Sequence, residues 1–169
     1  ALEMARKWVD FGHQVDVVTC FPNHPTGVVP AGYRGKLYQR EVLSDGITVY
    51  RNYVYATPNH GFFRKTIGHL SFMVSSVVLS MYRVRRPDVI VVSSPTLFAV
   101  VSAYVFSRLR RVPYVFEVRD LWPAAIASLG VLDSSSWVVR ALEKLELFLY
   151  HRAARVVTVT AAFRQDIAS

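Results

Sequence analysis

Short apolar segments alternate along this chain with longer segments of helical periodicity, and this alternation limits the fold more than any other feature. Residues 88–92 (DVIVV) form a continuous apolar run, which is typical of a parallel strand covered on both faces. Further strands are predicted at residues 14–19, 47–54, 114–118 and 155–160, and helices at 1–11, 66–86, 97–111 and 134–151. Because strands that alternate with helices of this length form open parallel sheets, we predict an α/β fold with a Rossmann-like, doubly wound parallel sheet.

The length of 169 residues and the 52% hydrophobic content fit one domain, so we expect residues 1–169 to belong to a single Rossmann-like domain. The chain opens inside a predicted helix, whereas such domains begin with a strand and a glycine-containing turn. We therefore expect that domain to be truncated at both ends and its first strand to lie upstream. Residues 20–46 are predicted to form one long connection, a candidate functional loop.

The formal charge of +8 indicates an anionic neighbour, such as nucleic acid, anionic lipid or a phosphorylated small molecule. The aromatic residues lie mostly inside apolar periodic segments rather than among Arg and Lys, so we expect no nucleic acid partner. The one cysteine, Cys20, cannot form an intramolecular disulfide or a cysteine metal cluster. A cytoplasmic location is the default expectation.

The segment that begins at Thr66 carries no charged residue until Arg83, and basic residues lie on both sides of it. It is long enough to span a bilayer, but it contains Gly68, His69 and four serines, so we expect a buried or interfacial helix. Its basic flanks favour peripheral binding to an anionic membrane surface. Alternatively, these residues only cap and solubilise a core helix.

Polar residues follow several predicted strands, at the edge where open α/β sheets bind ligands. Asn23 and His24 lie in FPNHPTG, Ser94 in SSPT, and Thr160 in TVTA. We predict that these four residues bind an acceptor molecule. A rigid surface loop explains the first segment as well, and helix capping explains SSPT.

The segment EVRDLWP carries the densest cluster of charged residues after any predicted strand. Asp120 is the candidate to orient or deprotonate an acceptor hydroxyl, and Arg119 the candidate to meet a phosphate. Trp122 is predicted to stack on a sugar face or to pack. The alternative is a buried structural ion pair between Arg119 and Asp120. We expect these residues and the four above to converge on one edge of the domain.

Four spaced segments, RKWVDFGHQVDVVTCFPNHPTG, PDVIVVSSPTLFA, VPYVFEVRDLWPAAIASLGVL and RAARVVTVTAAFRQDI, together resemble the N-terminal domain of bacterial family-four retaining glycosyltransferases of O-antigen, capsule and colanic acid biosynthesis. The resemblance implies half of a GT-B fold, a nucleotide-sugar donor as substrate, no cofactor and no required metal. It also implies retention of configuration and a lipid-linked or polysaccharide acceptor, received by this domain.

Many members of that family have a histidine in the segment that matches EVRDLWP, and this chain has none there, so no catalytic histidine is assigned. Because the resemblance places the donor-binding domain downstream, these residues alone are expected to be inactive. Two alternatives remain: a nucleotide-sugar epimerase of GT-B architecture, and a non-catalytic module for membrane docking or interaction.

Overall fold

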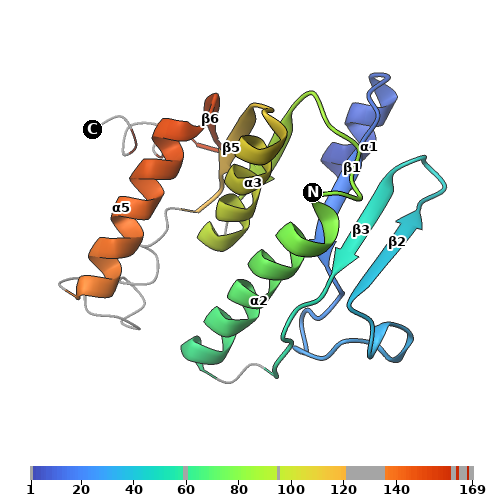
Figure 1. The fold of residues 1–169 in the computed structure, drawn as a ribbon, viewed down its shortest axis with the longest axis horizontal. Helices are drawn as coiled ribbons and strands as arrows, with labels where there is room; N and C mark the ends of the chain where they lie inside the picture. The colour runs from blue at the N-terminus through green and yellow to red at the C-terminus, as the bar shows by residue number, and fades with distance from the viewer. Residues whose placement is uncertain are drawn as a thin grey trace. The chain divides into compact units, whose positions relative to one another are not determined.

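The computed structural model describes residues 2–58, 61–94, 96–120, 136–160, 163 and 167. The chain divides into two compact units, residues 1–85 and 86–169, and each unit is described by itself. Each contains a three-stranded sheet with parallel strands (Figure 1). The predicted α/β class is therefore confirmed, while the single domain over residues 1–169 stays a prediction.

The first unit is built on a sheet with the strand order β1-β3-β2. Strand β1 (Asp16–Cys20) runs parallel to β3 (Thr48–Asn52), and β2 (Tyr38–Val42) runs antiparallel to β3. The expectation of one long connection over residues 20–46 is thus wrong in its second half, because β2 adds an edge strand there. A short 3-10 helix, η1 (Ala31–Tyr33), also lies in this segment.

Two helices cover opposite faces of this sheet. Helix α1 (Leu2–Asp10) places Ala5 against Ile47 and Val49 in a buried cluster. Helix α2 (Phe62–Ser80) contacts β1 and β3 and bonds to Asn52. Since Val49 and Asn52 differ in parity along β3, they point to opposite faces. Helix α2 ends at Ser80, six residues earlier than the sequence predicted.

The second unit contains the parallel sheet β4-β5-β6. Its strands are β4 (Ile90–Ser93), β5 (Tyr114–Val118) and β6 (Arg155–Thr158), and the helices between them are α3 (Leu97–Arg110) and α5 (Trp137–Arg152). Ser136 caps α5, since its hydroxyl accepts a hydrogen bond from the Val139 amide at 3.3 Å.

The core of this unit lies on the face of the sheet that α3 and α5 cover (Figure 1). Alternate residues of β5 point into it and are almost fully buried, together with side chains of both helices: Tyr114, Phe116, Val118, Leu97, Val100 and Leu149. The Tyr114 hydroxyl donates to the Leu149 carbonyl at 2.5 Å, so α5 is bonded to the centre of the sheet. This core holds the carboxyl ends of β4, β5 and β6 in fixed positions.

No helix in the described part of the chain is long and apolar enough to cross a membrane. This finding agrees with the expectation that the segment beginning at Thr66 does not span a bilayer.

Candidate functional site

The carboxyl ends of β4 and β5 are joined through one buried side chain, Ser94. Its hydroxyl accepts hydrogen bonds from the amide of Arg119 at 2.8 Å and from the amide of Asp120 at 3.2 Å, and it lies 3.5 Å from the Asp120 carbonyl. The Ser94 amide in turn donates to the Glu117 carbonyl at 3.0 Å. Ser94 is 3% exposed, so its hydroxyl bonds to protein backbone rather than to solvent.

The sequence did not indicate that the Ser94 hydroxyl bonds to the backbone of Arg119 and Asp120. Its prediction as an acceptor-binding residue stays a prediction, but the geometry shows a residue that fixes the backbone of the two charged residues. A serine hydroxyl offers two acceptor lone pairs and one donor, and all three face the turn at residues 119 and 120.

The side chains of Arg119 and Asp120 are exposed, and no ion pair joins them among the described residues. The alternative of a buried structural ion pair is therefore wrong. Two opposite charges thus follow β5 on a backbone that Ser94 holds. Trp122, the third residue singled out in this segment, lies outside the described residues.

Glu117 was not singled out from the sequence, yet it lies at the same strand end. Its carboxylate accepts a hydrogen bond from the Ser93 hydroxyl, across the pair that the parallel register places side by side. The sequence does show an acidic residue within an apolar strand, which could have marked Glu117 as a candidate. Its partner Ser93, however, is identified only by the register between β4 and β5. Ser93 and Glu117 therefore add a second polar link between β4 and β5.

Thr160 follows β6 and is exposed. Its hydroxyl accepts a hydrogen bond from the Phe163 amide at 3.2 Å, and its carbonyl accepts one from the Thr158 hydroxyl at 3.1 Å. Both contacts are local, since they join Thr160 to residues at most three positions away. Its role in acceptor binding stays a prediction.

In the first unit, Asn23 and His24 lie in the loop after β1, with Asn23 half-buried and His24 exposed. The Gly27 amide donates to the Asn23 carbonyl at 2.6 Å and closes a turn around both residues. Gly27 has a φ of 72°, and a β-carbon there would lie 2.0 Å from the Thr57 carbonyl oxygen. The loop is therefore held close to residue 57, as expected of a rigid segment.

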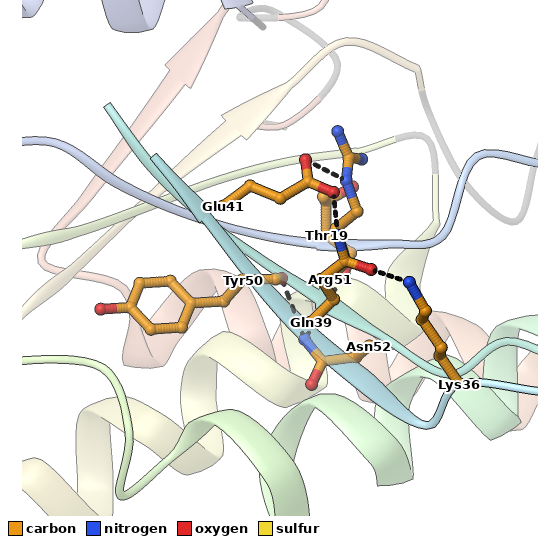
Figure 2. Close-up of polar contacts among 7 residues, drawn as sticks. All are labelled: Thr19, Lys36, Gln39, Glu41, Tyr50, Arg51 and Asn52. Carbon is orange, nitrogen blue, oxygen red and sulfur yellow. Dashed lines mark hydrogen bonds and ion pairs between the residues drawn. The ribbon is translucent and has the colours of Figure 1, made fainter. Parts of the chain in front are cut away.

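A chain of polar side chains covers the strands beside this loop (Figure 2). Lys36 donates to Gln39 at 2.9 Å, Gln39 donates to Glu41 at 2.9 Å, and Arg51 pairs with Glu41 at 2.8 Å. The Arg51 guanidinium also lies 5.5 Å from the centre of the Tyr33 ring. Sequence reasoning missed this group, because four of these five residues lie in the segment taken as one connection.

Asn52, the residue after Arg51 on β3, connects this part of the sheet to its neighbours. It is fully buried, and its amide nitrogen donates to the carbonyls of Tyr50 at 3.1 Å and Thr19 at 3.4 Å. Its side-chain oxygen accepts from the Ser80 hydroxyl at 2.8 Å. Figure 2 shows Asn52 beside Thr19 of β1 and Tyr50 of β3. Because the same side chain also bonds to α2, the end of β1 that carries the loop is fixed.

The predicted site residues thus fall into two groups. Asn23 and His24 belong to the first unit, and Ser94, Arg119, Asp120 and Thr160 belong to the second, where the first three are in direct contact. The convergence of the two groups on one edge stays a prediction.

Parallel strands joined through helices, with polar and charged residues at their carboxyl ends, define the α/β class of ligand-binding domains. The family described as "Glycosyl transferase 4-like domain" matches residues 1–169. The chain therefore belongs to the glycosyl transferase 4-like domain family, and the family expected from the sequence is confirmed.

A relative in Escherichia coli (strain K12), WcaI, carries the name of a colanic acid biosynthesis glycosyl transferase. It is 30% identical to this chain over 121 residues, which are 71% of this chain and 29% of WcaI. The chain thus matches less than a third of the length of this curated relative.

Proposed function

We propose that the protein containing these residues transfers a sugar from a nucleotide-sugar donor to a lipid-linked or polysaccharide acceptor, with retention of configuration. Membership of the glycosyl transferase 4-like domain family over the whole chain is the observation that carries this proposal. The name of the relative WcaI supports a polysaccharide as the final product. The reaction is proposed to need neither a cofactor nor a metal.

The exposed pair Arg119 and Asp120 supports a role at the reacting groups. Asp120 has a carboxylate that can accept the proton of an acceptor hydroxyl or orient that hydroxyl. Arg119 has a planar guanidinium that binds phosphate oxygens in pairs, either of the donor or of a lipid-linked acceptor. Ser94 positions both by their backbone amides, so neither charged side chain is needed to hold the turn.

A membrane-bound acceptor is supported by the surface of α2. Five apolar residues on it recur every three or four positions and are more than a third exposed: Phe63, Ile67, Leu70, Val74 and Val78. Basic residues lie at both ends of the helix, with Arg64 and Lys65 in its first turn and Arg83 and Arg85 shortly after its last residue. An apolar stripe with basic ends is typical of helices that lie in the interface of an anionic bilayer. We propose that the protein works peripherally at the cytoplasmic membrane face.

Radiolabelled nucleotide sugars and a lipid extract as acceptor test the reaction, with the natural polypeptide that contains these residues. We expect Asp120→Asn to lower kcat by about 100-fold or more, because it removes the base while keeping the shape of the side chain. Arg119→Gln is expected to raise KM for a phosphorylated substrate. Arg140→Gln, an exposed substitution on α5, is the matched control and should leave both constants unchanged.

Three outcomes would contradict parts of this proposal. Loss of activity with EDTA would contradict a metal-free reaction. An anomeric configuration in the product that is opposite to that of the donor, measured from the NMR coupling of the anomeric proton, would contradict retention. Conversion of the nucleotide sugar to its epimer without an acceptor would replace transfer by epimerisation.

A further inference from the structure

Arginines gather at the amino-terminal edge of the β4-β5-β6 sheet, the edge opposite Ser94. Arg86 precedes β4, a group at 108–111 precedes β5, and Arg152 and Arg155 lie at the start of β6. Because the three strands are parallel, with Ile90 beside Tyr114 and Val115 beside Arg155, their amino ends lie at one edge. A basic patch is therefore built from three separate parts of the chain.

A cavity of about 380 Å³ lies in this edge, lined by Ser107, Arg108, Arg111, Val112 and Pro113. Its wall is a tight turn, since the Ser107 hydroxyl donates to the Val112 carbonyl at 2.6 Å and the Val112 amide donates to the Ser107 carbonyl at 3.0 Å. Arg86 adds a third guanidinium, which donates to the Arg111 carbonyl at 3.4 Å. The arginines are thus presented on a fixed backbone.

Arg111 has a backbone conformation that is unusual for its type. It follows the last residue of α3 and has a φ of 54°. Among the described residues, Arg111 is the only one other than glycine that has a positive φ. Glycine is the common residue at this position after a helix, because a β-carbon disfavours left-handed backbone. An arginine kept in such a conformation at the wall of a cavity points to a use for its side chain.

Neutralisation of the α3 helix dipole explains only part of this cluster. Arg108 lies in the last turn of α3, where a positive charge is favourable, but Arg86 lies on a different segment. In the described ranges no carboxylate forms an ion pair with Arg86, Arg108 or Arg111. All three residues are exposed. The positive charge at this cavity is therefore open to a ligand.

We propose that this cavity binds a phosphate group, with Arg108 and Arg111 as its main ligands and Arg86 beside them. Guanidinium groups bind phosphate oxygens in pairs, and a fixed turn reduces the entropy lost on binding. The site is separate from the Arg119 and Asp120 edge, because the five residues of β5 lie between, at about 3.3 Å each. The phosphate comes either from a soluble diphosphate or from a lipid headgroup.

Two binding assays on the natural polypeptide that contains these residues distinguish these sources, and neither depends on glycosyl transfer. Inorganic pyrophosphate is titrated by calorimetry, and sedimentation with phosphatidylglycerol or phosphatidylcholine vesicles measures lipid binding. The test variant combines Arg108→Gln with Arg111→Gly, since glycine accepts the left-handed backbone and keeps the turn. The control combines Arg140→Gln with Lys144→Gln, which removes the same charge from exposed positions on α5.

We expect the test variant to weaken binding at least tenfold in one of the two assays, and the control to change it less than twofold. A loss limited to pyrophosphate assigns the site to a soluble diphosphate, and a loss limited to phosphatidylglycerol vesicles assigns it to a lipid headgroup. Saturable binding that both double variants weaken equally would overturn the proposal, because net charge alone would explain it. Absence of binding in both assays would overturn it as well.

Discussion

Glu146 is a carboxylate with an environment that opposes its charge. Burial raises its pKa to about 6, although the Tyr150 hydroxyl donates a hydrogen bond to it at 2.7 Å and favours the charged form. The neighbouring Glu143 adds a smaller effect in the direction of burial. The folded protein therefore holds the Glu146 proton more tightly than the unfolded chain does.

Replacement of Glu146 by Gln is expected to stabilise the protein at pH 7. A pKa raised on folding contributes stability that is fully present below the unfolded value of about 4.5 and is lost as the pH rises through about 6. Gln has no charge to bury, and its carbonyl can still accept from Tyr150. We expect a gain of about 1 kcal/mol at pH 7, which is about half of what the full pKa shift would give, because solvent partly screens this incompletely buried carboxylate. Urea unfolding measures this gain, and we expect no gain at pH 4.

Glu143→Gln is the control for this titration, because Glu143 is exposed and its removal leaves Glu146 able to ionise. The control should keep the decline of stability between pH 4.5 and 6. If Glu146→Gln shows the same decline as the unaltered protein, another group is responsible for it.

The charged pair after β5 was predictable, whereas the residue that holds it was not. Arg119 and Asp120 stand out because they are adjacent charged residues directly after an apolar strand. Ser94 was found as a polar residue, but a local pattern cannot tell an exposed hydroxyl from one that bonds to backbone 25 residues away. That distinction depends on the register between β4 and β5.

Sequence periodicity located the described helices and strands to within a few residues, except for α2, which ends six residues earlier than predicted, and β2, which was not predicted. The segment Tyr38–Val42 contains Arg40 and Glu41 and lies on the edge of its sheet, so it lacks the apolar run that marks β4. Charged residues are common on edge strands, where they prevent further pairing. Because β2 is short, polar and preceded by a glycine- and proline-rich segment, its sequence does not predict a strand. The strand is identified only by its pairing with β3.

The loop after β1 gives a prediction about glycine. Gly27→Ala should destabilise the protein by roughly 2 kcal/mol or more, because the added β-carbon meets the Thr57 backbone and the φ of 72° disfavours it. Gly35→Ala is a close match, since Gly35 has a φ of 74° but open space around it. Its cost should be about 1 kcal/mol. Equal costs in urea unfolding would show that the approach to Thr57 is unimportant.

For the protein as a whole, the proposed attachment to membranes depends on apolar contact as well as charge. Val74 and Val78 are 56% and 61% exposed on α2. Replacing both by Ser should weaken binding to phosphatidylglycerol vesicles by about fivefold, since about 1 kcal/mol of apolar burial is lost. Sedimentation at low and high salt measures the effect.

Val42→Ser with Leu147→Ser is the control for that experiment, because these residues are 63% and 53% exposed on β2 and α5. The control should bind as the unaltered protein does. If both double variants lose the same affinity, attachment does not occur through α2.

Backbone amides hold the turn at Arg119 and Asp120, and every residue type except proline has such an amide. Mutations at these two positions can therefore exchange the chemical groups offered to a substrate without dismantling the support beneath them. Under the proposed role of residues 119 and 120, a lineage that keeps Ser94 is free to change the acceptor that these two positions meet, one nucleotide change at a time. Loss of Ser94 would instead alter the position of both residues together, whatever their side chains.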